Sequence, residues 1–313
     1  MRVAVLGAGG QGGYFGGLLA SSGVDVHLID RGVHLAAIRK GGLTLRPDGG
    51  RAITVRVRAT DDPASVGHCD YVLVCVKTYD LVSALERAEP LVGPATALLS
   101  VQNGIDAPGA IARAFGTERV IAGVSYVAAR IEEPGVVAFG GVTNRIVLGR
   151  PTGPGEDRAR ELAGALRAAG IEAEVTQRIR EALWEKLVLV CATGGVMALL
   201  RLPWGEVLDS PVGRALARGV MKEVEVVGRA CGADLPVGTA ERVFHFARAN
   251  IGRSTRSSML DDLLRGRRLE LDALNGTVVR LGNEVGEPTP LNRTVCLALG
   301  PHAKGDPLRS ASE

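Results

Sequence analysis

Three glycines near the start of the chain have the spacing of a phosphate-binding turn. A run of β-forming residues leads into Gly7, Gly9 and Gly12, which follow the pattern G-x-G-x-x-G, and the apolar segment 14–20 continues at helical periodicity. In this pattern the first glycine permits a sharp turn, the second lets the backbone approach a pyrophosphate, and the third lets the helix pack against the strand. The phosphates then bind N–H groups at the start of the helix. The spacing favours a dinucleotide site over an ordinary glycine-rich turn.

The end of the second predicted strand indicates which dinucleotide is bound. The strand 24–29 is followed by Asp30 and Arg31. An acidic residue at this place usually accepts the ribose 2′-OH of NAD, whereas an arginine pairs with the 2′-phosphate of NADP. A charged contact contributes about 1.5–3 kcal/mol and a neutral hydrogen bond about 0.5–1.5 kcal/mol. We therefore expect NADP (as NADPH), with NAD less favoured.

Two further polar residues follow apolar strands in the first half of the chain. Lys77 follows the segment 71–76, and Asn103 follows the segment 97–101. Ligands of open α/β sheets bind outside the carboxyl ends of the strands, so both residues are expected where cofactor and substrate meet. A solvated lysine and an ordinary Asn-Gly turn are the alternatives for each residue taken alone.

In the second half, Lys186 interrupts an apolar helical segment. A partly dehydrated lysine has a lowered pKa and can donate to a developing oxyanion. Periodicity alone favours a surface lysine whose stem lies along an amphipathic helix. Ser257, Ser258 and Glu270 form a second polar group, which a helix cap and a solvated helix face would also explain.

Composition limits the class of protein. The 313 residues fit about two domains. The 37 basic and 34 acidic residues are spread along the chain, so we expect a small anionic ligand and no nucleic-acid partner. The five cysteines have no disulfide or zinc spacing, and no metal is expected. Because no signal peptide and no apolar run of membrane-span length is evident, we expect a cytoplasmic protein.

The periodicity changes from mixed to helical near residue 176. Strands and helices alternate before it, with hairpins expected at 43–57 and 123–140, and almost only helices follow. The predicted fold is an α/β Rossmann-like dinucleotide-binding domain, 1–176, followed by an all-α domain, 177–313. The second-half helices are expected at 180–200, 213–230, 239–249, 257–264, 269–285 and 291–299.

The chain resembles the ketopantoate reductase (2-dehydropantoate 2-reductase) family over nearly its full length. The resemblance implies reduction of a 2-oxo acid by NADPH in a cleft between a Rossmann domain and a helical domain, with ketopantoate reduced to pantoate in pantothenate biosynthesis. The matching blocks are Gly7-Ala8-Gly9-Gly10-Gln11-Gly12, Val76-Lys77-Thr78, Gln102-Asn103-Gly104, Leu183-Trp184-Glu185-Lys186-Leu187, Ser257-Ser258-Met259-Leu260-Asp261-Asp262 and Glu270-Leu271-Asp272-Ala273-Leu274-Asn275-Gly276.

The resemblance also implies roles for individual residues. Lys186 would protonate the carbonyl oxygen, and Glu270 would hold the lysine or a substrate hydroxyl. Ser258 would bind the polar end of the substrate, with Thr255 and Asn103 beside it. The cofactor residues would be Gly7, Gly9, Gly10, Gln11 and Gly12 at the pyrophosphate, Arg31 at the 2′-phosphate, and Lys77 and Asn103 on the nicotinamide side.

Two positions depart from the family pattern on the lysine helix. Val190 and Gly194 stand where the family usually has asparagines, four and eight residues after the lysine. Thr255 stands where it usually has an asparagine, three residues before the serine. We expect a more apolar pocket that is roomier at Gly194, in which Thr193, Thr255 or Ser258 could replace the lost hydrogen bonds. A less polar 2-oxo acid is therefore an alternative substrate.

A non-catalytic NADP(H) sensor and a homodimer-forming assembly protein are the alternatives to an enzyme, and the retained Lys186 and Glu270 argue against both.

Overall fold

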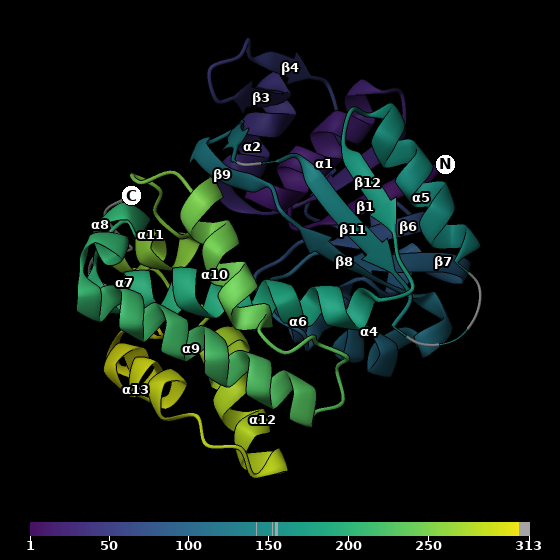
Figure 1. Cartoon of the computed structure of the whole chain (residues 1–313). Coiled ribbons are helices and arrows are strands. Elements are labelled where there is room, and N and C mark those ends of the chain that lie inside the picture. Colours follow the sequence, from purple (N-terminus) through teal and green to yellow (C-terminus); the bar gives the residue numbers. More distant parts are fainter. Residues whose placement is uncertain (142, 152, 154–155, 307–313) are drawn as a thin grey trace. The chain divides into compact units, whose positions relative to one another are not determined.

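The computed structural model describes residues 1–141, 143–151, 153 and 156–306, and the chain folds into two compact units (Figure 1). The first unit contains residues 1–102 and 106–179, and the second contains residues 103–105 and the chain from Arg180 onward. The first unit is an α/β unit of the Rossmann type and the second is helical, so the predicted fold class is confirmed. The short segment 103–105, which follows a strand of the first unit, packs with the helical unit.

Eight strands form one sheet in the first unit, in the order β12-β11-β8-β7-β6-β1-β2-β5. All neighbouring strands run parallel except β8 and β11. The chain continues from β1 to β2 on one side and later to β6 on the other, so the carboxyl ends of β1 and β6 form the switch point at which open α/β sheets bind ligands. The strands are β1 (Arg2–Leu6), β2 (Asp25–Ile29), β5 (Arg58–Thr60), β6 (Cys69–Val74), β7 (Val92–Ser100), β8 (Val120–Ser125), β11 (Arg145–Gly149) and β12 (Glu172–Val175).

Helices cover both faces of this sheet because its central strands are apolar on both faces. In β1, Ala4 and Val5 are fully buried and belong to different apolar cores. One core includes residues of α1 and α5, and the other includes residues of α3 and α4. The helices are α1 (Gly10–Ser21), α2 (Gly32–Gly41), α3 (Leu81–Arg87), α4 (Ala107–Phe115) and α5 (Asp157–Ala168).

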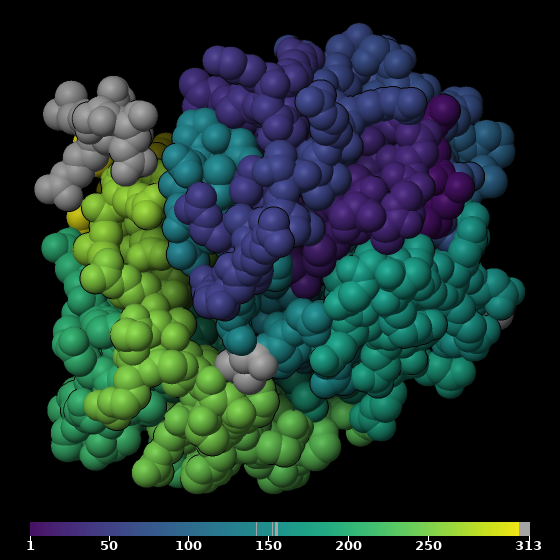
Figure 2. Space-filling model, turned by 90° about the horizontal axis from the view of Figure 1, so that it is seen from above, coloured from purple at the N-terminus to yellow at the C-terminus, as the bar shows by residue number. Residues whose placement is uncertain are grey.

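A second sheet of four strands lies in the same unit, in the order β4-β3-β10-β9. Its strands are β3 (Leu43–Pro47), β4 (Ile53–Val55), β9 (Ala128–Glu133) and β10 (Val136–Gly140). The expected hairpin between 43 and 57 is present as the antiparallel pair β3 and β4. Figure 2 shows the atoms of the residues near 45 beside the teal atoms of the residues near 135, in agreement with the pairing of β3 with β10.

The expected hairpin at 123–140 is wrong in its first part. Residues 123–125 end strand β8, which pairs with β7 and β11 in the large sheet, and only β9 and β10 form a hairpin. Gly123 lies so close to Leu99 and the carbonyl of Ser100 that an added Cβ would be 2.8–2.9 Å from them. Pairing with strands distant in sequence therefore determines where this segment goes, and local alternation does not.

Helix α1 packs between the two sheets because glycines lie on the faces that contact them. An added Cβ on Gly10 would lie 2.2 Å from the carbonyl oxygen of Ala129 in β9, and one on Gly13 would lie 2.7 Å from Val137 in β10. On the other side, an added Cβ on Gly16 would lie 2.6 Å from Leu28 in β2. The second sheet is thus fixed directly on the helix that begins at the glycine-rich turn.

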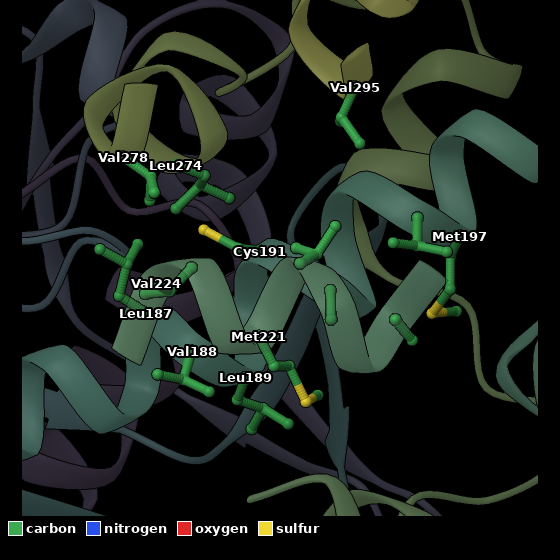
Figure 3. Close-up of a cluster of buried hydrophobic side chains, with 14 of the residues drawn as sticks. Leu187, Val188, Leu189, Cys191, Met197, Met221, Val224, Leu274, Val278 and Val295 are labelled. Carbon is green, nitrogen blue, oxygen red and sulfur yellow. The ribbon is translucent and has the colours of Figure 1, made fainter. Parts of the chain in front are cut away.

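The second unit consists of helices around one apolar core, part of which Figure 3 shows. Trp204 and Met221 are fully buried in this core. The short helix α8 was not expected from the sequence. The helices are α6 (Ile179–Val190), α7 (Met197–Leu200), α8 (Trp204–Asp209), α9 (Pro211–Ala230), α10 (Thr239–Asn250), α11 (Ser258–Leu264), α12 (Thr277–Val285) and α13 (Pro290–Leu299).

Two of the expected long helices contain a π-helical turn. The segment Cys191–Val196 is π-helical between α6 and α7, and Asp272–Gly276 is π-helical before α12. A π turn holds more residues than an α turn, so it changes which residues share a face on its two sides. Periodicity of 3.6 residues therefore predicts the faces correctly only up to Val190.

The stretch Ile179–Leu200 is long and apolar enough to cross a membrane by length and composition. It contradicts the expectation that no apolar run reaches membrane-span length. However, 67% of its most apolar window is buried inside the protein. This is the environment of a core helix in a soluble protein, whose apolar side chains are covered by neighbouring helices.

Candidate functional site

The glycine-rich turn lies at the carboxyl end of β1, and each of its three motif glycines has a different surrounding. Gly7 has φ +91°, and an added Cβ there would lie 2.8–3.0 Å from Val76, which follows β6. An added Cβ on Gly12 would lie 1.9 Å from the carbonyl oxygen of Gly7. Around Gly9, in contrast, no protein atom lies within 4 Å of an added Cβ. The turn is therefore tightly packed on the side of the sheet and open at Gly9.

The start of helix α1 is suited to an anion. Gly9 is the N-cap residue, no side chain caps the helix, and the first turn contains no acidic residue. The first N–H groups of a helix have no intrahelical acceptor and lie at the positive end of its dipole. The N–H groups of Gly10, Gln11 and Gly12 can thus bind a phosphate, and the open side at Gly9 leaves room for one.

The side chain of Gln11 is engaged within the first unit. Its Nε2 donates to the carbonyl oxygen of Val127 at 2.7 Å, and its Oε1 accepts a hydrogen bond from Ser125 Oγ at 2.9 Å. These bonds fix the start of α1 to the segment between β8 and β9. What Gln11 can offer to a phosphate is therefore its backbone N–H.

Asp30 and Arg31 follow β2, and each has a polar contact within the first unit. Asp30 Oδ1 accepts a hydrogen bond from the backbone N–H of Arg31 at 2.8 Å. The Arg31 side chain is 76% exposed, and its guanidinium lies 3.5 Å from Asp80. An exposed guanidinium in a long ion pair can turn toward a phosphate at little cost.

Lys77 and Asn103 belong to different units. Lys77 directly follows Val76, the residue that packs on Gly7, and is half-buried. Asn103 is also half-buried, and it precedes Gly104, which has φ +99° and whose added Cβ would lie 2.8 Å from the carbonyl oxygen of Ala273. Asn103 is therefore placed by the π-helical segment Asp272–Gly276, which also follows Glu270 closely in sequence.

Lys186 lies on α6 in surroundings unlike those of a solvated lysine. The next two residues, Leu187 and Val188, are fully buried, and the Lys186 side chain is half-buried. Desolvation by burial lowers the pKa of the Lys186 amine from 10.5 to about 8. Its neighbour Glu185 forms an ion pair with Arg242 at 2.7 Å.

The polar residues near α11 have separate structural environments. Ser257 caps α11, because its Oγ accepts a hydrogen bond from the backbone N–H of Leu260 at 3.1 Å. Ser258 is the first residue of α11 and is exposed, as is Thr255. The carbonyl oxygen of Thr255 accepts a hydrogen bond from the N–H of Trp204 at 3.1 Å, which fixes this loop to α8. Glu270 is half-buried and lies in the same unit as Lys186.

Gly194, where the sequence predicts a roomier pocket, lies beside Leu274 and Met259. Gly194 lies in the π-helical segment and is buried, and an added Cβ would be in ordinary contact with Leu274 and Met259, at 3.7–3.9 Å. A Cβ at this position would therefore fit without displacing either neighbour. Thr193 Oγ1 donates to the carbonyl oxygen of Leu189 at 2.9 Å, so only its lone pairs are left for a ligand.

Asn275 has a structural role that sequence reasoning did not assign. It is fully buried, and its Nδ2 donates to the carbonyl oxygen of Cys191 at 3.2 Å and to Asn292 Oδ1 at 2.9 Å. A π turn leaves a carbonyl group without its usual α-helical donor, and Asn275 supplies one. It therefore holds the two π-helical segments together. Because its partners lie 84 and 17 residues away, no local sequence pattern could have revealed this role.

Among the described residues, no group of His, Cys, Asp or Glu side chains could hold a metal ion. The first unit instead combines a parallel sheet, a glycine turn at its switch point and an open helix start, and the second unit contributes a desolvated lysine. These features define a dinucleotide-dependent oxidoreductase.

The comparisons with known proteins assign the chain to a family. Residues 3–153 match the family described as Ketopantoate reductase PanE/ApbA, and residues 178–302 match its C-terminal domain, Ketopantoate reductase PanE/ApbA C terminal. The chain belongs to this ketopantoate reductase family and is an oxidoreductase of the type that acts on a CH–OH group. The chain is 33% identical to the 2-dehydropantoate 2-reductase of Mesorhizobium japonicum over 311 residues, which cover 93% of this chain and 94% of that protein.

Two solved structures illustrate the range of similar proteins. The PanE/ApbA family ketopantoate reductase from Ralstonia eutropha JMP134 has a TM-score of 0.87 and 37% identity, covering 97% of this chain and 98% of that one. D-mandelate dehydrogenase with NADH and anilino(oxo)acetate has a TM-score of 0.88 at 22% identity, covering 97% of this chain and 98% of that one. The second likeness is one of fold alone.

Proposed function

We propose that the protein reduces 2-dehydropantoate (ketopantoate) to pantoate with NADPH, as a step of pantothenate biosynthesis. The substrate is supported by the activity that names relatives such as the Mesorhizobium japonicum protein. In this proposal, residues 1–176 bind the dinucleotide, and residues 177–313 carry the catalytic and substrate-binding groups. The desolvated amine of Lys186 is the single observation that carries the chemistry.

The glycine turn would hold the cofactor pyrophosphate on the N–H groups of Gly10, Gln11 and Gly12, with Gly7 and Gly9 giving the turn its shape. When bound, the reduced nicotinamide supplies a hydride. We prefer NADPH to NADH because the Arg31 guanidinium is exposed, whereas Asp30 is engaged with the backbone of Arg31. Lys77 and Asn103 would lie on the nicotinamide side.

Lys186 would act as the general acid. An amine with a pKa of about 8 is protonated at neutral pH and is nevertheless a stronger acid than an ordinary lysine. Its charge would stabilise the negative charge that develops on the carbonyl oxygen, and its proton would then complete the hydroxyl group. A desolvated amine does this better than a solvated one because less water screens the interaction.

The remaining polar residues would orient Lys186 and the substrate. Glu270 would accept a hydrogen bond from the Lys186 amine or from a substrate hydroxyl. Ser258 and Thr255 are exposed hydroxyl groups near the start of α11 and would bind the polar end of the substrate, together with Asn103.

A less polar 2-oxo acid is the second candidate substrate, and the observation that favours it is the lack of a polar side chain at Val190 and Gly194. Val190 is half-buried, and Gly194 is covered by Leu274 and Met259, so neither position offers an amide. Buried amides left without a partner disfavour a substrate that lacks a hydroxyl by about 1–3 kcal/mol each. We therefore expect ketopantoate to be preferred over its analogue without the hydroxyl by less than about a hundredfold in kcat/KM.

NADPH oxidation with ketopantoate and a panel of 2-oxo acids tests this proposal. We expect measurable turnover of ketopantoate and comparable turnover of less polar acids. A preference for ketopantoate above about ten-thousandfold would show that other side chains replace the missing amides. Tight NADPH binding without turnover of any acid would favour an NADP(H)-sensing protein instead.

The compartment and the assembly state are also part of the proposal. The five cysteines are all free thiols, which is typical of a reducing compartment, and we propose that the protein acts in the cytoplasm on a small-molecule substrate. A homodimer is part of this proposal, and sedimentation of the purified protein tests it.

A further inference from the structure

His34, in helix α2, is a buried histidine whose two ring nitrogens both bind backbone groups of the first unit. The residue is 6% exposed. Nδ1 accepts a hydrogen bond from the backbone N–H of Gly135 at 3.0 Å. Nε2 lies 3.1 Å from the carbonyl oxygen of Ala8. These partners are 101 and 26 residues away in the chain, so His34 connects segments that no local pattern relates.

The two contacts determine the tautomer. A backbone N–H can only donate, so Nδ1 carries no proton. The carbonyl oxygen of Ala8 can only accept, so the proton of the neutral ring lies on Nε2 and is donated to Ala8. A doubly protonated ring would place an N–H against the N–H of Gly135, so only the neutral form satisfies both contacts.

The two partners belong to the glycine-rich turn and to the second sheet. Ala8 lies between Gly7 and Gly9, so its carbonyl is part of the turn that presents the helix start. Gly135 lies in the turn between β9 and β10, and its own carbonyl oxygen accepts a hydrogen bond from the N–H of Thr44 in β3 at 2.9 Å. The same β9 strand packs directly on Gly10 of α1. His34 and this packing thus attach the turn to the second sheet at two points.

We propose that His34 is a positioning residue, which holds the glycine-rich turn in its phosphate-binding conformation by tying the Ala8 carbonyl to the second sheet. Gly7 and Gly12 are packed closely, but Gly9 is open and glycine restricts its own backbone little, so the Ala8 carbonyl before it needs a partner such as His34. The inference rests on the proposed dinucleotide site. The second sheet then serves cofactor binding although none of its side chains needs to touch the cofactor.

The charges near His34 favour different protonation states. Burial lowers the pKa of the His34 ring, and the carboxylate of Asp30, at the end of β2, opposes this effect. The glycine turn contributes the backbone of Ala8, and the β9–β10 turn contributes the backbone of Gly135. Glu133, at the end of β9, lies 3.6 Å from Arg46. The ring therefore stays neutral at neutral pH, and acidification removes the contact with Gly135.

Substitutions of His34 separate the two hydrogen bonds. His34→Ala removes both, and we expect the Kd for NADPH, measured by nicotinamide fluorescence, to rise about tenfold or more, the factor typical of a lost buried hydrogen-bond partner. His34→Gln can place an amide N–H where Nε2 lies, and His34→Asn can place an oxygen where Nδ1 lies. We expect His34→Gln to restore most of the affinity and His34→Asn to restore less, because the Ala8 contact holds the turn. In all three variants KM for NADPH should change more than kcat.

A matched control comes from the second unit. Trp204 Nε1 donates to the carbonyl oxygen of Ala247 at 3.1 Å and is buried, so Trp204→Phe also removes one buried side-chain donor to a backbone carbonyl. We expect it to lower the thermal stability and to leave the Kd for NADPH unchanged. Equal Kd values for the wild type and His34→Ala, or an equal rise in Trp204→Phe, would overturn the inference.

The pH profile gives a readout that a merely structural residue would not change. Burial lowers the pKa of the His34 ring from its ordinary 6.5, so the Kd of the wild type should rise only at pH values well below 6.5, where the ring becomes protonated, and His34→Gln should lack this component. The 2′-phosphate of the cofactor has its own pKa of about 6, so the difference between the two proteins is the measured quantity. Parallel pH profiles of Kd in the wild type and His34→Gln would contradict a role for the neutral ring. This comparison does not use His34→Ala, so it tests the inference even where that variant fails to fold. If the wild type binds neither NADPH nor NADH, the proposed function itself fails.

Discussion

The two units offer different kinds of groups to the proposed anionic ligands. In the first unit the site consists of backbone N–H groups and of space left by missing side chains, as at Gly9. In the second unit it consists of side chains, above all the desolvated amine of Lys186. A site made of backbone N–H groups depends on the backbone conformation and is blocked by side-chain atoms added beside it. A site made of side chains depends on the pKa and the surroundings of single groups. Substitutions should therefore affect the two sites in different measurements.

The largest effect is expected from Lys186. Lys186→Ala should lower kcat by about two to three orders of magnitude, because the acid and its positive charge are both lost, while NADPH binding barely changes. Lys186→Arg keeps a charge but holds its proton too tightly to donate it, so a comparable loss is expected. Glu185→Gln, which breaks a neighbouring ion pair with Arg242, is the control. A loss of less than tenfold for Lys186→Ala would return Lys186 to the role of an ordinary surface lysine.

Two alanine substitutions in the glycine turn should separate binding from folding. At Gly9 an added Cβ meets no protein atom within 4 Å and φ is −61°, so Gly9→Ala should keep the wild-type melting temperature. Its methyl group would stand on the open side of the turn, and we expect about a hundredfold weaker NADPH binding.

At Gly12 the added Cβ would lie 1.9 Å from the carbonyl oxygen of Gly7. Gly12→Ala should therefore lower the free energy of unfolding by about 1–3 kcal/mol or more, as overpacking does. Calorimetry and fluorescence titration of both variants check the pair. Unchanged affinity in Gly9→Ala would show that the phosphates bind elsewhere.

Arg31→Ala tests the cofactor preference. Loss of a charged contact to the 2′-phosphate should raise the Kd for NADPH by about tenfold and leave the Kd for NADH unchanged, the effect being moderate because the side chain is 76% exposed. Arg39→Ala is the matched control, since Arg39 lies on α2, the helix that Arg31 precedes, and also forms an ion pair, with Asp61 at 2.6 Å. Equal or better kcat/KM with NADH in the wild type would show that Asp30 dominates.

The smallest effect is the pH dependence of the wild type. With a pKa of about 8, Lys186 loses its proton as the pH rises, so the protonated fraction and kcat/KM should fall about fourfold between pH 7 and 8.5. A lysine with an ordinary pKa of 10.5 would give no change in this range. A flat profile would therefore contradict the desolvated acid and leave the glycine turn unaffected.

The sequence alone determined the fold class and the location of the glycine turn. Alternating apolar strands and helices, followed by helices only, identify a Rossmann-like domain and a helical domain, because these periodicities follow from local backbone geometry. The glycine turn could be recognised from the sequence because its conformation requires glycine at fixed positions. Gly7 needs a positive φ, and Gly12 leaves no room for a Cβ. For Lys186 the periodicity gave only a charged residue in an apolar segment, and the family resemblance supplied its role.

Only the tertiary structure decided where the chain departs from local rules. The π-helical turn at Cys191–Val196 changes the faces of a helix that periodicity treats as regular, and it places Gly194 beside Leu274 and Met259. Other contacts join segments that are distant in the sequence. Residues 123–125 pair within the large sheet, and His34 and Asn275 each form hydrogen bonds with distant backbone groups. Such contacts depend on which surfaces meet after folding, and the desolvation that lowers the pKa of Lys186 depends on the same packing.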